Sequence, residues 1–395
     1  MYNKLNVYDK HIFLEQSMEP KMIYLDNAAT TWPKPECVIE AVKDAMIRCG
    51  GNPGRGGHRL ALAAGELLYD VREHTASFFG CEDPFRVTFT MNITTAVNLV
   101  IRGALSAGDH VLVSPMEHNA VMRPLTEYGI TYDILPGNPD GSIDPLRIPE
   151  MIRPNTKMII ICHESNVNGV IQPLAQIAQA AHQNRILLMA DCAQSAGHLP
   201  IHIDKEGIDF LCFTGHKGLF GPTGTGGVIF GKDVDIEQIK PLVCGGTGSL
   251  SERFDQPEFI PDRFESGTQN VCGLAGLDAG LSWLEQQGLG KISADCREKI
   301  TKLRVGLQPI PYVSVYSGAG NVLSITIDGK DNGIAAAELE NNYGIMTRIG
   351  LHCAPLAHRT LGTFPNGTIR FAVSPFTTDE EIETCIHACR ELSEE

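Results

Sequence analysis

The amino-acid sequence predicts an α/β protein with a mainly parallel sheet in a large domain, followed by a smaller α+β domain. With 395 residues, of which 43% are hydrophobic and 20% charged, the chain can bury a sizeable core and form two domains. Short β-rich segments alternate with helical patterns between residues 85 and 231, which is typical of a parallel sheet covered by helices. After Gly273 this alternation ends.

Seven β-rich segments make up the expected sheet. They are residues 86–90, 110–114, 131–135, 157–162, 186–191, 208–213 and 226–230. Ahead of them, the apolar residues Leu60, Ala63, Leu67, Val71 and Phe78 recur near helical spacing and predict a helix that precedes the sheet.

The pattern after Gly273 indicates the second domain. A helical stretch runs through Trp283, shorter strands such as residues 322–327 follow, and a last helix starts at Asp379. We therefore expect a large domain at residues 22–275 and a small domain at 276–395, with the N-terminal segment able to pack on the small domain. Residues 1–21 are polar and unpatterned, which predicts a flexible extension.

Composition argues against nucleic-acid and membrane partners. The chain has 32 basic and 47 acidic residues, a formal charge of -15, and no basic cluster that would attract a polyanion. No apolar stretch approaches the roughly 18 residues of a membrane span, and the N-terminus lacks a secretory pattern. We expect a cytoplasmic protein whose partners are small molecules or other proteins.

The twelve cysteines predict a reduced protein with one exceptional thiol. No Cys-x-x-Cys pair occurs, and Cys162, Cys192 and Cys212 lie in apolar segments typical of a core. Cys385 and Cys389, one helical turn apart, favour a buried helix face over a metal site because no second ligand pair accompanies them. Cys353 instead lies in Arg-Ile-Gly-Leu-His-Cys-Ala-Pro, where cationic neighbours would raise the thiolate fraction.

Lys217 is the leading candidate for a chemically active side chain. It follows an apolar strand in Phe-Thr-Gly-His-Lys-Gly-Leu-Phe-Gly-Pro, among glycines that let the backbone close around a bulky ligand. A lysine that forms a Schiff base becomes nucleophilic through burial or a nearby positive charge. The alternative is a solvated lysine in a glycine-rich connection.

Other polar residues follow the predicted strands, where ligands gather in open α/β sheets. Met91-Asn-Ile-Thr-Thr95 either caps a helix or also holds a phosphate, and His118 either stacks on a ring or is a solvated loop histidine. Ser165-Asn166 follows a third strand. Asp191 ends an apolar strand, where it caps a helix or pairs with a cation.

Together these residues match the needs of pyridoxal phosphate (PLP). This cofactor requires a lysine for its aldehyde, an acid for its ring nitrogen and donors for its phosphate. A P-loop is excluded because no lysine follows the glycines at 221–227, and a Rossmann turn is excluded because no strand, Gly-x-Gly-x-x-Gly and helix occur in order. No metal site is expected.

From about residue 22 to its C-terminus the chain resembles the class V aminotransferase-like, fold-type I PLP enzymes, and within them the cysteine desulfurase and selenocysteine lyase branch. Seven ordered motifs carry this resemblance: Tyr24-Leu-Asp-Asn-Ala-Ala-Thr-Thr31, Asn92-Ile-Thr-Thr-Ala96, Met116-Glu-His118, Asp191-Cys-Ala-Gln194, Thr214-Gly-His-Lys217, Phe264-Glu-Ser-Gly-Thr268 and residues 348–355. The compact cysteine loop resembles the SUF-type branch more than the branch with a longer, mobile loop.

The resemblance implies a role for each matching residue around the cofactor. Lys217 would form the Schiff base, Asp191 would pair with the pyridine nitrogen, His118 would stack on the ring, and Gln194 would bond its phenolic oxygen. The phosphate would be held by Thr94, Thr95, Thr214 and His216, with Thr268 contributed by the neighbouring subunit of a homodimer.

The resemblance also implies the reaction, which is removal of sulfur from L-cysteine. Asn166, Arg370, His58 and Arg348 would bind the substrate, and a bidentate arginine suits its carboxylate. Lys217 would take the α-proton and Cys353 would attack the substrate sulfur, leaving alanine and a persulfide for a protein sulfur acceptor. From local sequence alone, Arg370 could equally be an ordinary charge at a strand end.

Three positions depart from the family pattern. The segment after Lys217 is one residue longer before Gly-Pro, Asn119 replaces a common histidine, and Thr214 replaces a common serine. The first two leave the substrate open, so selenocysteine lysis or another PLP-dependent lyase or aminotransferase reaction stays an alternative. A sulfur-relay or scaffold protein without catalysis is a more distant one.

Overall fold

The computed structural model describes residues 21–54 and 56–394. Within these ranges a seven-stranded sheet is built from β2 (Val87–Thr90), β3 (His110–Val113), β4 (Thr131–Ile134), β5 (Thr156–Cys162), β6 (Leu187–Asp191), β7 (Phe210–Thr214) and β8 (Gly226–Phe230). The strand order is β2-β8-β7-β6-β5-β3-β4, and only β8 runs antiparallel to its neighbours in it. The α/β class and the mainly parallel seven-stranded sheet are thereby confirmed.

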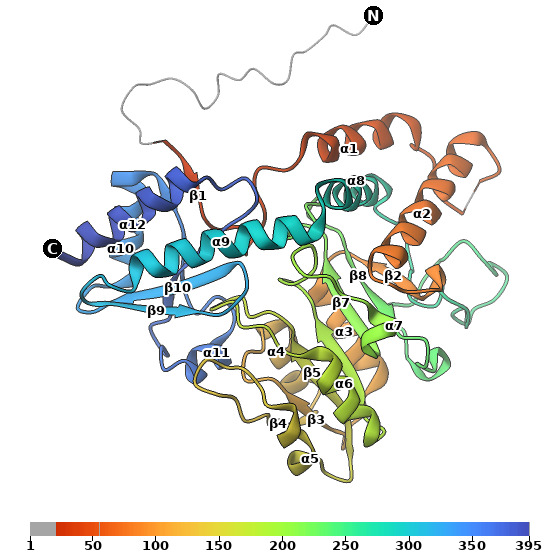
Figure 1. The fold of residues 1–395 in the computed structure, drawn as a ribbon. Coiled ribbons are helices and arrows are strands. Elements are labelled where there is room, and N and C mark those ends of the chain that lie inside the picture. Colours follow the sequence, from red (N-terminus) through yellow and green to blue (C-terminus); the bar gives the residue numbers. More distant parts are fainter. Residues whose placement is uncertain (1–20, 55, 395) are drawn as a thin grey trace, which may run out of the picture.

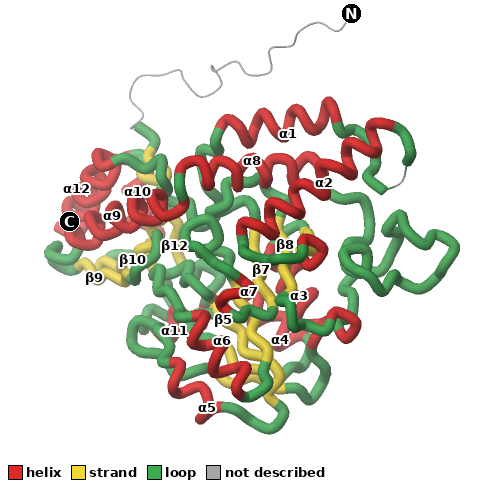
Figure 2. Tube along the Cα trace, turned by 45° about the vertical axis from the view of Figure 1, so that its right-hand side comes forward, coloured by secondary structure: helices red, strands yellow, loops and turns green. Residues whose placement is uncertain are grey.

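Helices cover both faces of this sheet (Figures 1 and 2). Alternate residues of each strand enter opposite cores, because side chains alternate between the two faces of a strand. In β5, Met158 and Ile160 pack with α3 (Ile93–Ala104) and α4 (Asn119–Glu127), whereas Ile159 and Ile161 pack on the other face with α6 (Leu174–Gln183). Burial on both faces explains why the strands read as continuous apolar segments.

A second, antiparallel sheet belongs to the C-terminal part of the chain. Its order is β12 (Arg348–Gly350), β13 (Thr368–Ala372), β10 (Val322–Ile327) and β9 (Val313–Ser317). The start of the described chain joins it, because β1 (Ile23–Tyr24) pairs in parallel with β11 (Ile345–Met346). Beside these strands lie α9 (Leu289–Leu307), α10 (Asn332–Tyr343) and α12 (Asp379–Glu394) (Figure 1).

The remaining described elements are all helices. They are α1 (Glu36–Arg48), α2 (Arg59–Phe78), α5 (Ile148–Met151), α7 (Ile203–Glu206), α8 (Val271–Gln287), α11 (Pro355–Thr360) and the 3-10 helices η1 (Pro84–Arg86), η2 (Pro145–Arg147) and η3 (Ile236–Gln238). No described helix is long and apolar enough to cross a membrane.

The predicted helix ahead of the sheet is α2. Of the residues that predicted it, Val71 is buried and Leu67 and Phe78 pack against the core. Leu60 is 41% exposed, whereas Ala61, Ala64 and Val71 are buried. Several large apolar residues therefore lie on the outside of α2, with Leu62 also exposed. Helical spacing identified the helix, yet it does not specify which of two adjacent apolar stripes a neighbouring helix covers.

The predicted domain division stays a prediction, and its boundary at residues 275 and 276 falls inside α8. The predicted flexible extension covers residues 1–21, of which 1–20 lie outside the described part of the chain.

A buried ion pair fixes α2 to the segment that follows the large sheet. The Arg72 guanidinium donates to both carboxylate oxygens of Glu265 at 2.8 and 2.7 Å, and the two side chains are 4% and 5% exposed. Glu265 also accepts from the backbone N of Phe89 at 2.7 Å, and Arg72 donates to the carbonyl of Val87. The pair thus joins α2, β2 and the segment ahead of α8.

Glu265→Ala is expected to lower the free energy of unfolding by about 3–5 kcal/mol, because it leaves the Arg72 charge buried without its partner. Denaturant unfolding monitored by circular dichroism measures this change. The matched control is Glu40→Ala, which removes an exposed partner of Lys43 and should cost at most about 1 kcal/mol. Equal effects of the two substitutions would contradict the structural role of the buried pair.

Candidate active site

The carboxyl ends of β5, β6 and β7 bring the predicted catalytic residues together. In the sheet register Asp191 lies beside Cys162 on one side and Cys212 on the other, and Lys217 follows β7. Lys217 lies within electrostatic reach of Asp191 and Arg370. The lysine, the strand-end acid and the arginine, which are far apart in sequence, therefore share one site.

Burial sets the protonation of this pair. Lys217 keeps some exposed surface, but burial lowers the pKa of its ammonium to about 8, against a raising effect of Asp191. Burial also raises the pKa of the Asp191 carboxyl, which is 3% exposed and accepts from the backbone N of Ala193 at 3.0 Å. Lys217 is thus shifted toward the neutral amine that nucleophilic attack requires.

His118 and Asn92 begin the two helices beside the site. His118 Nδ1 accepts from the backbone N of Ala120 at 2.9 Å, so this nitrogen is unprotonated. Burial, followed by the Lys217 charge, lowers the pKa of His118 to about 4. The ring is therefore neutral near pH 7 and carries its proton on Nε2.

The N-terminus of α3 is the candidate anion site. Asn92 Oδ1 accepts from the backbone N of Thr95 at 2.9 Å and from its hydroxyl at 3.1 Å, while Thr94 is exposed beside them. The Thr95 hydroxyl would have to turn from Asn92 to donate to a bound phosphate. The positive end of α3 favours such an anion.

The backbone before Lys217 is held by residues from the N-terminal segment. Lys34 Nζ donates to the carbonyl of His216 at 2.8 Å and lies 2.6 Å from the Thr31 hydroxyl, and Thr31 Oγ1 donates to the carbonyl of Lys217 at 2.9 Å. His216 Nδ1 is buried and has no hydrogen-bond partner among the residues that the structure describes. Thr214 Oγ1 makes only a long contact, 3.4 Å, with the carbonyl of Thr225.

Arg370 lies on β13 and enters the site from the small sheet. It is 2% exposed and donates to Asp26 Oδ1 at 2.6 Å and to the carbonyl of Asn166 at 3.1 Å. Within residues 21–54 and 56–394, its Nε has no hydrogen-bond partner. Arg348, exposed on β12, is paired opposite Arg370 in the sheet register. Gln194 is buried shortly after β6, and its Nε2 donates to the carbonyl of Ala28 at 3.0 Å.

Cys353 is exposed on a turn between β12 and α11. Its carbonyl accepts from the backbone N of Asn119 at 2.7 Å, directly after His118. Cys353, His118 and Thr94 line one cavity of about 690 Å³. The structure therefore places this thiol at the same cavity as two other residues of the predicted site.

Two predicted residues lie apart from this group. Thr268 is exposed, accepts from Asn52 Nδ2 at 3.2 Å and lines a different cavity of about 310 Å³. His58 is exposed at the N-terminus of α2, where its Nδ1 accepts from Ala61 N at 3.4 Å. Within the described residues, no hydrogen bond or ion pair joins either of them to Lys217 or Cys353. Arg55 of the same motif lies outside the described residues.

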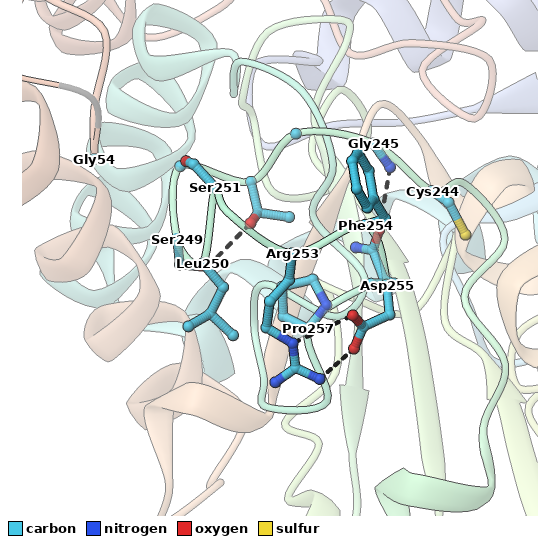
Figure 3. Close-up of a pocket in the computed structure, with 14 residues that line it drawn as sticks. Gly54, Cys244, Gly245, Ser249, Leu250, Ser251, Arg253, Phe254, Asp255 and Pro257 are labelled. Carbon is cyan, nitrogen blue, oxygen red and sulfur yellow. Dashed lines mark hydrogen bonds and ion pairs between the residues drawn. The ribbon is translucent and has the colours of Figure 1, made fainter.

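A larger cavity of about 820 Å³ lies on the segment of residues 244–257 (Figure 3). The Arg253–Asp255 ion pair and backbone from this segment form its walls. None of the residues lining it belongs to the Lys217 group. Its size alone does not make it the active site.

Sequence reasoning missed the role of Glu117, which is fully buried. Its Oε1 accepts from Ser114 Oγ and from the backbone N of Cys162, each at 2.6 Å. Burial raises the pKa of Glu117 to about 8, so the carboxyl is mainly protonated near pH 7. Its position directly before His118 was the available signal; the residue fixes that loop to β5.

The cysteine predictions agree with the structure where it tests them. Cys162, Cys192, Cys212, Cys385 and Cys389 are buried free thiols. In residues 21–54 and 56–394 there is no group of three or more His, Cys, Asp or Glu side chains that could hold a metal ion.

Sequence comparison gives the family that this fold and site define. Residues 23–385 match the aminotransferase class-V family. The chain belongs to that family. It is 32% identical to a probable cysteine desulfurase from Methanothermobacter thermautotrophicus over 94% of each chain. It is 30% identical to a cysteine desulfurase from Escherichia coli O157:H7 over 92% of each.

Solved structures agree with this assignment. The apo structure of a cysteine desulfurase from Thermococcus onnurineus NA1 matches with a TM-score of 0.87 and 30% identity, over 94% of this chain and 95% of that one. An Escherichia coli cysteine desulfurase in an S-sulfonic acid form matches with a TM-score of 0.84 and 29% identity, over 93% and 94%. The confirmed resemblance is to the family and to cysteine desulfurases; the SUF-type branch stays a prediction.

Proposed function

We propose that the chain is a PLP-dependent cysteine desulfurase that converts L-cysteine to L-alanine and receives the sulfur as a persulfide on Cys353. The position of Cys353 supports this most directly, since an exposed thiol shares a cavity with His118 and Thr94 beside the Lys217 and Asp191 pair. A thiol is the nucleophile that sulfur transfer requires. Relatives over most of the chain carry the name cysteine desulfurase.

The residues present fit PLP. Asp191 is a buried acid able to pair with the pyridine nitrogen, and Lys217 is an amine shifted toward its neutral form. The buried His216 Nδ1 has no partner in the described part of the chain, which suits a phosphate ligand. Thr94, Thr95 and Thr214 would complete the phosphate site. His118 would stack on the ring, and Gln194, which still has a second amide hydrogen, would bond the phenolic oxygen.

Side chains of the protein would bind the substrate and accept its α-proton. When bound, the cofactor supplies an electron-accepting ring that stabilises the charge left when the substrate loses its α-proton. Arg370 would bind the substrate carboxylate, helped by Asn166, with Arg348 at the entrance. Lys217 Nζ would accept the α-proton because burial keeps a fraction of it neutral.

The sulfur step is balanced within the enzyme. The Cys353 thiolate attacks the substrate sulfur, so a new S–S bond forms as the substrate Cβ–S bond breaks and its electron pair stays with the substrate carbon. That carbon takes up a proton and becomes the methyl group of alanine. Cysteine and one enzyme thiol thus give alanine and one enzyme persulfide.

We also propose a homodimer and a protein sulfur acceptor. Thr268 is exposed on the segment that also carries Phe254 and Phe259, two largely exposed aromatic residues. A second copy covering this segment would let Thr268 reach its partner's phosphate site, and His58 could reach the substrate in the same way. Because Cys353 is exposed, an acceptor thiol could approach the persulfide directly.

Cys353→Ala should lower the rate of alanine production from L-cysteine by at least about 100-fold. The visible absorbance of the bound cofactor should stay unchanged. Alanine and sulfide are measured with a reductant present. Cys244→Ala, which removes another exposed cysteine, should keep wild-type turnover. Unchanged alanine in the Cys353 variant would move the function to another PLP-dependent lyase or aminotransferase reaction, and alanine from L-selenocysteine alone would identify the selenium branch.

Cofactor uptake by the cofactor-free protein should depend on pH through Lys217. The neutral amine attacks the aldehyde, and the Lys217 pKa of about 8 makes roughly a tenth of it neutral at pH 7 and about half at pH 8. The uptake rate should therefore rise steeply below pH 8 and level off above about 9. Stopped-flow absorbance measures this uptake rate. The control is the reaction of the cofactor with Nα-acetyl-lysine in solution, which keeps its ε-amine. Levelling only above about pH 10 would show an unshifted amine.

A further inference from the structure

The turn that carries Cys353 accepts hydrogen bonds from two segments next to the large sheet. Asn166 Nδ2 donates to the carbonyl of His352 at 2.7 Å, and the backbone N of Asn119 donates to the carbonyl of Cys353 at 2.7 Å. Asn166 follows β5 and Asn119 begins α4, so two separate elements hold adjacent carbonyls. Among the described residues, no hydrogen bond holds the exposed thiol of Cys353, so its position follows that of its backbone.

The backbone of this turn is unusual. His352 and Cys353 have φ angles of 48° and 57°, in the left-handed region that residues with a Cβ rarely adopt. Such a conformation persists only where surrounding contacts enforce it. The bonds from Asn166 and Asn119 are contacts of this kind, because each holds a carbonyl of one of the two residues.

The other side of the turn is fixed to the small sheet. His352 Nε2 lies 2.9 Å from the Thr368 hydroxyl on β13. Within the turn itself, the backbone N of Ala354 donates to the carbonyl of Leu351 at 2.7 Å. β13 also carries Arg370, two residues further along. The turn is thus attached to the strand of the proposed carboxylate ligand, and Asn166 reaches it from the opposite side.

Asn166 contacts both groups. Its carbonyl accepts from Arg370 Nη1 at 3.1 Å while its side-chain amide donates to His352, and it is 6% exposed. The orientation of this amide is set by its partner, since a backbone carbonyl only accepts. One buried residue therefore links the arginine that would hold the substrate carboxylate to the backbone of the attacking thiol.

We propose that Asn166 is a positioning residue for the nucleophile, whose side-chain amide fixes the Cys353 turn relative to a substrate held by Arg370. The catalytic meaning of this rests on the proposed function, but the link itself is a property of the protein alone. A residue that only bound the carboxylate would affect substrate affinity. A residue that places Cys353 also controls how often the thiol meets the substrate sulfur.

Hydrogen exchange tests the link without any reaction. Asn166→Ala should speed amide exchange in residues 349–356 by about 2–10-fold, because one hydrogen bond to the turn is lost. Asn166→Leu fills similar space without a donor and should do the same, which separates the bond from a packing defect. The matched control is Asn168→Ala in the same loop, whose amide bonds Asp140 instead and should leave this segment unchanged.

Unchanged exchange in both Asn166 variants would overturn the proposal, as would an equal increase in the Asn168 variant. Thermal unfolding of each variant shows that it is folded. These outcomes do not depend on whether the chain desulfurates cysteine.

Turnover then separates positioning from substrate binding. L-β-Chloroalanine presents the same carboxylate but loses chloride without attack by a thiol, giving pyruvate and ammonia after water is added. Asn166→Ala should lower kcat for L-cysteine by at least about tenfold more than kcat for L-β-chloroalanine. Equal losses with the two substrates, or a change confined to KM, would assign Asn166 to carboxylate binding alone.

Discussion

The parallel register of β5, β6 and β7 is the constraint on which the site depends. It sets Asp191 beside Cys162 and Cys212, so an acid is enclosed by apolar strands on both sides. An acid so placed favours a cation, and the position three residues beyond β7 holds Lys217. Because the ends of these strands are buried in two cores, a slip by one residue would turn Asp191 to the opposite face.

The small sheet contributes Arg370 and the Cys353 turn to the site. Arg370, a fully buried cation, needs an acidic partner and receives one from Asp26, close to the start of the described chain. The Cys353 turn also comes from the small sheet and is bonded back to Asn119 and Asn166. The proposed cofactor ligands and the proposed nucleophile thus come from different sheets, and Asn166 is one of the residues that join the two.

Much of this arrangement could be predicted from the sequence because the relevant signals are local. The strands are short apolar segments, so β8 and β10 have the predicted bounds. Asp191 ends β6, and Lys217 lies three residues after β7. The partners of these residues could not be predicted that way. The Arg72–Glu265 and Arg370–Asp26 pairs join distant segments, and Glu117 reads as a solvated charge until its burial is known.

The pairing of Asp26 with Arg370 spans 344 positions of the chain, and β1 likewise pairs with β11. A ribosome therefore releases Lys217 and its sheet well before Arg370 can complete the site. Until then Lys217 is present without Arg370, the group proposed to bind the substrate carboxylate. The last strand of the chain, β13, is therefore the one that brings its two ends together at the site.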